Sequence, residues 1–429
     1  MVSITFSSGT TGESKAVIFT HEKLLLYFYD FETISHYFKQ TCVSILSLSH
    51  IGPRLNEWGL LSKGNTIIYT SYINYFEVLK KYKPCYLICV PKLLNMIIEK
   101  YKKECLKTSK IFKILNNIFF NISYEYYKLK YSKSNIFNLI SYFLYPLKFL
   151  GYKYFIKDVV NKFMNSESSI IVFGSTINKD IEKTVSVMGL KLIILYGMTE
   201  TSIVSCTSTQ YERPYSVGKI NKSMDVIISD LKTDTKLGYN EIGMIKVKGK
   251  QIMNGYYNNE KDTKRAFDKE GYIITGDLGY ITDNGFLYFV GRCKNIIVLN
   301  NGEHIDSMKI EQICSKSDFV QQIVVFGQDK PYLTAIIVLN KEYIHKWLQK
   351  KQIDISTQYG KDLLKKAVMV EINDLIGKDS LFRWTEQIRD VALIDEPFTI
   401  DNGLMTKKYT IIKNKVYNKY KDLIEKMYY

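Results

Sequence analysis

The chain has 429 residues, of which 46% are hydrophobic and 24% charged, and its formal net charge is +16. This length and balance predict a soluble globular protein of about two or three domains, and they exclude disordered and fibrous classes. Seven scattered cysteines without a histidine cluster exclude a disulfide scaffold and a metal site built from cysteine, and they predict reduced thiols in a cytosolic setting.

Targeting signals and membrane spans are not expected either. Met1 leads directly into a strand-like run rather than a secretory signal, and no run has the length and apolar purity of a membrane span. The positive charge has two explanations that stay open. Heavy use of Lys, Asn, Ile and Tyr is typical of an AT-biased coding sequence, whereas a functional cause would be attraction to nucleotides, coenzymes or an acidic membrane surface.

A glycine- and hydroxyl-rich segment follows the first predicted strand. Residues 7–15 read SSGTTGESK, between strand-like runs at 2–6 and 16–20. Glycines allow a tight turn, successive amides form an anion-binding nest, and Lys15 can complete a phosphate cradle. The spacing is not that of the GxxxxGK[ST] loop. The segment therefore predicts either a phosphate site or an ordinary hairpin.

Short strands and helices alternate in the following residues. Strand-like runs at 42–46, 65–69 and 84–90 alternate with helical patterns at 21–40 and 75–81. This alternation predicts an α/β domain with an open sheet.

Residues 94–165 differ in composition, because they are dense in lysine, tyrosine and phenylalanine. The apolar part at 136–149 is interrupted by Pro146 and Lys148. We predict a pair of long helices on the domain surface. The alternative is a basic, aromatic face that rests on a membrane interface.

Two further strands, at 169–173 and 191–195, are each followed by small or polar residues. These are Gly174 and Ser175 after the first strand, and Tyr196, Gly197, Thr199 and Glu200 after the second. In open α/β sheets, ligands collect at the carboxyl ends of strands. Alternatively, Glu200 is a solvated carboxylate at a helix start.

From residue 215 to 255, short strands with glycine turns predict a small β subdomain. The stretch 271–294 then reads GYIITGDLGYITDNGFLYFVGRCK. We expect Asp277 in a tight Gly-Asp turn at a strand end, where a carboxylate can accept both hydroxyls of a ribose. Arg292, at the end of the next strand, offers a forked donor for phosphate or ribose oxygens. The alternatives are a turn-forming aspartate and a surface arginine.

Read together, SSGTTGESK, YGMTET and TGDLGYITDNGFLYFVGRCKN resemble the motifs of the adenylate-forming superfamily, which includes acyl-CoA synthetases, luciferases and peptide-synthetase adenylation domains. Five further stretches are similar to segments of the long-chain acyl-CoA synthetases. They lie at residues 48–51, 83–92, 255–258, 301–303 and 397–404. The resemblance covers nearly the whole chain.

This resemblance implies an ATP-dependent ligase that works in two steps. A fatty carboxylate attacks the α-phosphate of ATP to give acyl-AMP and pyrophosphate, and the thiol of coenzyme A then displaces AMP. Such in-line attack depends on positioning and on neutralisation of charge. The partners implied are a fatty acid, ATP, Mg²⁺ and coenzyme A, and no nucleic acid.

The resemblance also implies a role for each motif residue. The β- and γ-phosphates would be held by Lys15 with Ser8, Gly9, Thr10, Thr11 and Gly12. Tyr196 would stack on adenine, in a pocket that includes Gly197, Gly174 and Ser175. Thr199 would touch phosphate, Glu200 would bind Mg²⁺, Asp277 would hold the ribose, and Arg292 would reach ribose or phosphate. The residues implied in catalysis are Lys15, Thr199, Glu200 and Arg292.

The implied architecture is an α/β core at residues 1–291, with the β subdomain at 212–291. A smaller α+β domain at 292–429 would rotate between the two half-reactions.

Three departures from the family pattern affect the prediction. A long N-terminal region precedes the phosphate loop in the family, so we expect this truncated core to be a fragment or a shortened paralogue. At the hinge, Asn295 replaces an acidic residue and Ser307 a proline. Thr410 stands where the family has a lysine, and Lys408 or Lys413 would have to substitute by a register change.

The sequence therefore predicts a long-chain fatty acid–CoA ligase. The alternative is a catalytically impaired or inactive paralogue that binds nucleotide or a membrane surface, and a third reading is an aryl or amino-acid adenylating enzyme. The acyl chain length has no sequence signal. We expect a cytoplasmic protein, or one at the periphery of an intracellular membrane such as the endoplasmic reticulum.

Overall fold

The computed structural model describes residues 3–7, 15–32, 40–130, 135–173, 177, 179–207, 215–378, 383–405 and 411–428. The chain forms two compact units, Met1–Val290 and Gly291–Tyr429. Each unit has hydrophobic cores of its own.

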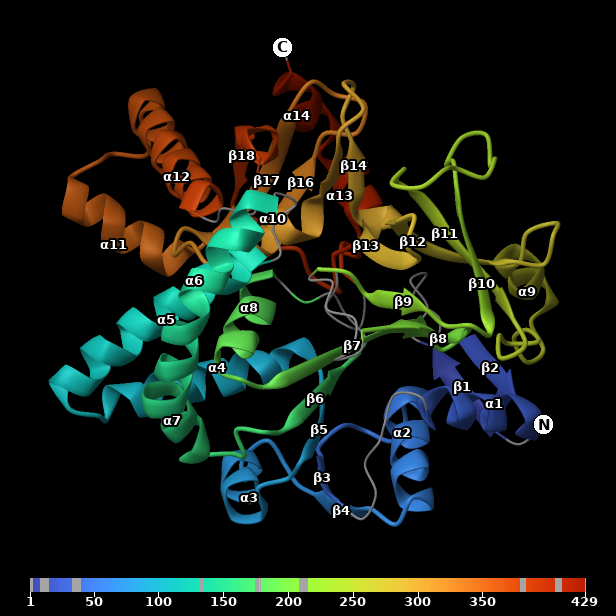
Figure 1. Ribbon diagram of the computed structural model, residues 1–429. Helices are drawn as coiled ribbons and strands as arrows, with labels where there is room; N and C mark the ends of the chain where they lie inside the picture. Colours follow the sequence, from blue (N-terminus) through green and yellow to red (C-terminus); the bar gives the residue numbers. More distant parts are fainter. Residues whose placement is uncertain are drawn as a thin grey trace. The chain divides into compact units, whose positions relative to one another are not determined.

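The first unit is built on a mixed sheet of 11 strands in the order β10-β11-β12-β13-β9-β8-β7-β6-β5-β3-β4 (Figure 1). Its parallel half consists of β3 Thr41–Ser44, β4 Thr66–Tyr69, β5 Tyr86–Cys89, β6 Ser169–Val172 and β7 Lys191–Met198. Its antiparallel half consists of β8 Ser202–Cys206, β9 Gly218–Ile220, β10 Met224–Ser229, β11 Gly243–Gly249, β12 Ile273–Ile281 and β13 Phe286–Arg292.

Both faces of the parallel half are covered, as expected for an α/β fold. Successive residues of a strand point to opposite faces, and β5 follows this rule. Tyr86 and Ile88 join one core, whereas Leu87 and Cys89 join the other. The helices around these cores are α1 His21–Glu32, α2 Ile51–Ser62, α3 Tyr75–Tyr82, α4 Pro91–Leu106, α7 Lys157–Asn161 and α8 Lys179–Val187.

The strands predicted for the small β subdomain extend this same sheet. Strand β7 runs on past its predicted end at residue 195 to Met198, and the chain turns back as β8, which pairs with it antiparallel. Strand β8 then pairs with β9, so the hydrogen-bonded ladder continues from the parallel into the antiparallel half. The turn after β7 therefore lies inside the sheet rather than at a helix start.

A separate hairpin contains the beginning of the chain. Strand β1, Ser3–Ser7, pairs antiparallel with β2, Lys15–Phe19, in a register that places Ser7 opposite Lys15. Val17 of β2 is fully buried and forms an isolated bridge with Tyr256. This bridge ties the hairpin to the segment before α9, Glu260–Ala266.

The lysine- and tyrosine-rich region forms helices, as predicted, but more of them than a pair. After α4 come α5 Lys110–Lys130 and α6 Asn135–Gly151, followed by a π-helical turn at Tyr152–Ile156. Helices α5 and α6 pack on each other. Within the described residues, no helix is long and apolar enough to cross a membrane.

The second unit is an α+β unit around a three-stranded sheet in the order β16-β17-β18. Its strands are β14 Ile296–Val298, β15 His304–Asp306, β16 Val320–Phe326, β17 Leu333–Leu339 and β18 Ile388–Ile394. Its helices are α10 Ser307–Cys314, α11 Lys341–Lys351, α12 Gln358–Lys378, α13 Lys413–Lys419 and α14 Lys421–Lys426. Alternate residues of β17 again serve two cores: Ile337 faces α10 and α12, and Ile336 faces α13 and α14.

Candidate active site

The predicted phosphate loop joins the two strands of the first hairpin. Residues Ser8, Gly9, Thr10, Thr11 and Gly12 lie outside the described residues. Its two ends are described, and there the Ser7 hydroxyl donates to the carbonyl oxygen of Lys15 at 3.4 Å. Lys15 is thus held at the first position of β2, directly after the loop.

Two side chains from the same neighbouring segment contact the Lys15 ammonium group. Its Nζ lies 3.2 Å from Oδ2 of Asp262, on α9, and 5.0 Å from the ring centroid of Tyr256. A backbone bond of 2.8 Å from the Tyr257 amide to the Ala16 carbonyl fixes the two segments side by side. The hydrogen bond from Lys15 lowers the pKa of Asp262. Lys15 is therefore paired with a carboxylate that water reaches easily, a kind of pair that contributes little to stability.

Glu200 lies in the turn between β7 and β8, and only 6% of its surface is exposed. Its Oε1 accepts a 3.1 Å hydrogen bond from the Tyr256 hydroxyl, and its carbonyl oxygen accepts one of 2.7 Å from the Met253 amide. Burial raises the pKa of Tyr256, and the nearby Glu200 carboxylate raises it further, so the hydroxyl stays protonated and donates. Thr199 lies in the same turn and is half-buried.

The backbone at Gly197 has no room for a side chain. The pairing of β7 with β8 shifts register between Tyr196 and Gly197. A Cβ at Gly197 would lie 2.0 Å from the Ser202 carbonyl oxygen. That oxygen belongs to the backbone and cannot move away to make room. Glycine therefore allows the close approach of the two strands that forms the turn carrying Glu200.

Asp277 is brought to Tyr196 across the sheet. The Tyr196 hydroxyl donates to Oδ2 of Asp277 at 2.8 Å, and Asp277 is 2% exposed. The Asp277 amide is itself held by the Thr275 hydroxyl at 3.0 Å. Tyrosine and aspartate thus fix each other on one edge of the site.

The prediction that Asp277 lies in a tight turn at a strand end was wrong. It lies within β12, where Met244 and Lys246 of β11 oppose Leu278 and Ile274, so β12 carries two extra residues. Gly276, with φ of +72°, supplies the left-handed backbone that such a bulge needs. The bulge turns the carboxylate out of the regular alternation of the strand.

Several predicted site residues are therefore linked by contacts. Tyr256 lies between Lys15 and Glu200, and Tyr196, four residues before Glu200 in the chain, binds Asp277. Gly174 and Ser175 lie outside the described residues. Arg292 is exposed and belongs to the second unit.

In the second unit, Lys413 is held by a buried carboxylate. Its Nζ lies 2.7 Å from Oε1 of Glu311, which also accepts a 2.9 Å bond from the Val325 amide. Burial raises the pKa of Glu311, and Lys413 opposes this shift. Lys413 also donates to the Ser307 hydroxyl at 2.5 Å, and Ser307 donates to the Asn295 carbonyl at 2.6 Å. Two positions that depart from the family pattern, Asn295 and Ser307, therefore form one hydrogen-bonded chain with Lys413, a candidate substitute for the family lysine.

Thr410 and Lys408 lie outside the described residues. In the described arrangement, the Lys413 ammonium group is committed to Glu311 and Ser307.

Sequence reasoning missed Tyr256 and Asp262 as site residues. Tyr256 falls in the GYYN stretch that carries part of the resemblance, and this was the one available signal. Asp262 has no such signal, because an acidic residue in the first turn of a helix is ordinary surface chemistry.

The donor set around Glu200 fits Mg²⁺ held together with a substrate. Among the described residues, no group of three or more His, Cys, Asp or Glu side chains could hold a metal ion. Mg²⁺ usually takes one or two carboxylates and completes its shell with substrate phosphates and water. Glu200, as a single largely buried carboxylate near Lys15, satisfies that requirement.

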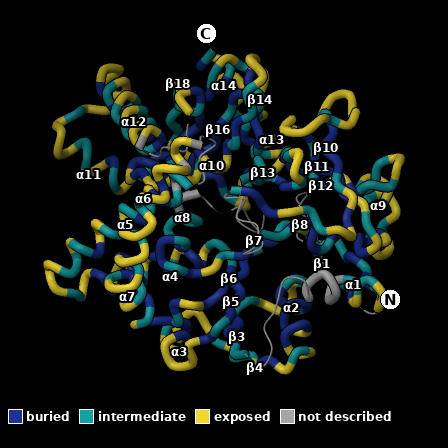
Figure 2. Tube along the Cα trace, viewed as in Figure 1, coloured by how far each residue is buried: buried dark blue, intermediate teal, exposed yellow. Residues whose placement is uncertain are grey.

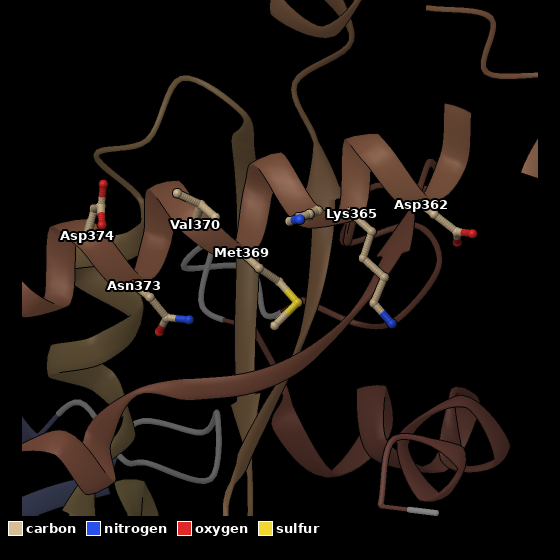
Figure 3. A pocket seen from close by; sticks show the side chains of 7 residues that line it. Asp362, Lys365, Met369, Val370, Asn373 and Asp374 are labelled. Atoms are coloured by element: carbon tan, nitrogen blue, oxygen red, sulfur yellow. The ribbon is translucent and has the colours of Figure 1, made fainter. Parts of the chain in front are cut away.

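A surface groove of about 460 Å³ lies elsewhere, on α12 (Figure 3). Its lining includes Lys365, Met369 and Asn373 and none of the predicted nucleotide-binding positions. The groove is open to solvent, and its lining residues all come from the single helix α12.

Comparison with known proteins shows the family of the chain. Residues 1–257 match the AMP-binding enzyme family, and residues 294–368 match the AMP-binding enzyme C-terminal domain. The chain belongs to the AMP-binding enzyme family. The predicted resemblance to the adenylate-forming long-chain acyl-CoA synthetases is confirmed at this level.

Two relatives from Arabidopsis thaliana illustrate the match. The long-chain-fatty-acid–[acyl-carrier-protein] ligase AEE15, chloroplastic, is 30% identical over 99% of this chain. Long chain acyl-CoA synthetase 7, peroxisomal, is 28% identical over the whole chain. The chain spans 61% of the length of each.

The fold is also found among solved structures. The crystal structure of ATP-bound MatB from Rhodopseudomonas palustris has a TM-score of 0.61 and 19% identity, over 98% of this chain and 68% of that one. The predicted adenylate-forming α/β fold with a smaller C-terminal region is therefore confirmed.

Proposed function

We propose that the chain activates long-chain fatty acids with ATP and transfers the acyl group to a thiol. The observation that carries this proposal is the contact series Lys15–Tyr256–Glu200 beside the Tyr196–Asp277 pair, in a member of the AMP-binding enzyme family. The carboxylate oxygen of the acid would form a bond to the α-phosphorus as the bond to pyrophosphate breaks, and a thiolate would then displace AMP from the acyl carbon.

In this proposal each described residue has a physical role. Asp277, fixed by Tyr196, would accept the ribose hydroxyls, and Tyr196 would bound the adenine pocket together with Gly197. Lys15 would exchange Asp262 for phosphate oxygens, which carry more charge and bind an ammonium more strongly. Thr199 would donate to a phosphate oxygen. When bound at Glu200, Mg²⁺ would neutralise phosphate charge.

The roles of the other predicted site residues are proposals that rest on the resemblance. Ser8, Gly9, Thr10, Thr11 and Gly12 would cradle the β- and γ-phosphates, and Gly174 and Ser175 would line the adenine pocket. Arg292 would reach the nucleotide from the second unit, Gly291–Tyr429, which would move between half-reactions.

The nature of the thiol is a further part of the proposal. Coenzyme A is the acceptor that the acyl-CoA synthetase relatives suggest, and an acyl-carrier-protein is suggested by the name of the other relative. We propose coenzyme A, because the long-chain acyl-CoA synthetase segments recur along this chain.

The test is a product assay on the purified full chain. With ATP, Mg²⁺, a long-chain fatty acid and coenzyme A, we expect pyrophosphate release that depends on the acid, together with an acyl-CoA thioester. If the acyl group is transferred to acyl-carrier-protein instead, the proposed activation of the acid by ATP stands, but coenzyme A is not the acceptor.

A second candidate function is nucleotide binding without ligase activity. It is favoured by Thr410 at the family's lysine position and by the engagement of Lys413 with Glu311. Binding of ATP with neither pyrophosphate nor thioester formed would select this candidate and reject the ligase.

A further inference from the structure

Helix α6, Asn135–Gly151, exposes apolar side chains where a helix facing water exposes polar ones. Ser141 is buried, whereas Tyr142 and Phe143 are 74% and 77% exposed. Figure 2 colours each element, α6 included, by burial. Its other exposed large apolar residues are Ile136, Phe137, Leu139, Ile140, Tyr145, Leu147, Phe149 and Leu150. We call these residues, apart from Tyr145, which packs on α5, the α6 face.

Contacts with α5 fix which side of α6 points inward. The ring centroids of Tyr126 and Tyr145 lie 6.0 Å apart, and the Lys148 ammonium group lies 5.1 Å from the Tyr126 centroid. A Cβ at Gly151 would lie 2.5 Å from the Phe119 side chain, so the helices touch there. With Ser141, these positions recur every three to four residues and form one stripe. The α6 face lies on the remaining sides and cannot turn inward without losing these contacts.

An apolar face of this extent marks a surface that is covered when the protein functions. Helix α5 adds exposed Ile111, Ile114 and Ile118 at helical spacing. Tyrosine and phenylalanine make up four of the nine residues of the α6 face, and a tyrosine ring, apolar with one polar end, suits a membrane interface.

The charge of this region indicates which partner covers it. Between residues 110 and 153 the sequence has a single acidic residue, Glu125, and its basic residues are Lys110, Lys113, Lys128, Lys130, Lys133, Lys148 and Lys153. A basic segment with an apolar face is complementary to a bilayer surface that carries anionic headgroups, which attract lysine. A protein partner would need an equally apolar surface together with concentrated acidic charge.

We propose that α6 lies in the headgroup layer of a membrane that contains anionic lipids. Its 17 residues would lie about 25 Å along the surface, with the α6 face toward the acyl chains and the lysines toward the headgroups. This placement agrees with the finding that no described helix can cross a bilayer. The proposal does not depend on the ligase activity.

The test is vesicle flotation of the full chain with phosphatidylcholine vesicles, with and without phosphatidylserine, at low and high NaCl. We expect flotation with the phosphatidylserine vesicles at low salt and less at high salt. The double variant Ile140→Ser/Phe143→Ser should lower the partition coefficient by at least about tenfold. Leu147→Ser/Leu150→Ser, at the other end of the helix, should do the same.

Ile73→Ser is the matched control, because Ile73 is 91% exposed but lies between β4 and α3, away from α6. It should float as the original protein does. Circular dichroism of each variant checks that the fold is retained. Equal flotation of the α6 variants and the control would overturn the proposal. So would binding that ignores phosphatidylserine, or a dimer in sedimentation that the α6 substitutions dissociate.

Discussion

Lys15 and Lys413 make ion pairs of similar length in unlike surroundings. Lys15 pairs at 3.2 Å with Asp262, whose side chain is 25% exposed, whereas Lys413 pairs at 2.7 Å with Glu311, whose side chain is 16% exposed and also accepts a backbone bond. A phosphate can displace a partly exposed carboxylate at small cost, whereas removing the cation from a largely buried carboxylate leaves a desolvated charge behind. We infer that Lys15 is available to a ligand, whereas Lys413 stabilises the packing of the second unit.

The largest effect is expected at Glu200, which Tyr256 links to Lys15. Glu200→Gln removes the charge that would hold Mg²⁺ but keeps an acceptor for Tyr256, so acid-dependent pyrophosphate release should fall by about 100-fold or more. Glu241→Gln, an exposed carboxylate of the same unit, is the control and should retain the rate. A Glu200→Gln protein with full activity would remove Glu200 from the site.

The next effect is on the stability of the second unit. Lys413→Met leaves the Glu311 carboxylate without its cation, so the free energy of unfolding should fall by about 2 kcal/mol, less than for a fully buried pair. Denaturant unfolding at pH 7 measures this change. If the free energy of unfolding falls by only about a few tenths of a kcal/mol, Lys413 contributes no more than an ordinary surface lysine.

The same variant makes a prediction about pH. The pKa of Glu311 is raised above its ordinary value of 4.5, so the folded protein binds this proton more readily than the unfolded chain. Stability from this group therefore falls as pH rises above that value, and Lys413→Met raises the pKa further because it removes the opposing charge. The loss of unfolding free energy caused by Lys413→Met should thus become smaller as the pH is lowered from 7 to about 5. A deficit that is constant over this range would contradict the assignment.

A smaller effect is expected from the tyrosine between Lys15 and Glu200. Tyr256→Phe keeps the ring beside Lys15 and removes the 3.1 Å hydrogen bond to Glu200, so kcat should fall by about tenfold. Because Tyr256 positions the Glu200 carboxylate and does not bind the fatty acid, the KM for the fatty acid should stay the same. Tyr257→Phe, the exposed neighbour, is the matched control.

The smallest effect should come from Asp262, the partly exposed partner of Lys15. Asp262→Asn removes a competitor for the ammonium group, so KM for ATP should fall by about two- to fivefold with no change in thermal unfolding. A weaker affinity for ATP would mean that Asp262 orients Lys15 instead of competing for it.

Much of the fold was predictable because its signals are local. The apolar runs of β3, β5 and β6 and the helical spacing of α3 lie within one or two residues of their predicted bounds. Glu200 and Asp277 were predicted as site residues because their motifs occur in a fixed order with recognisable spacing.

The remainder depends on contacts between distant residues. Tyr256 reaches Glu200 across 56 positions of the sequence, and the bulge that aims Asp277 exists only because β12 pairs with β11 in a shifted register. Helix α6 has an ordinary helical pattern, and only its packing on α5 shows that the apolar side faces outward. A local sequence pattern specifies neither the register of a strand pair nor the partner on which a helix packs.

The most direct test of the site is the affinity for AMP and for ATP of the original protein, Lys15→Met and Asp277→Asn, measured by calorimetry. If one nucleotide contacts both residues, Asp277→Asn should weaken AMP and ATP alike, because both carry the ribose. Lys15→Met should weaken ATP by about tenfold or more and leave AMP unchanged, because only ATP has the β- and γ-phosphates. Equal loss of both nucleotides in Lys15→Met, or unchanged binding in Asp277→Asn, would contradict the proposed site.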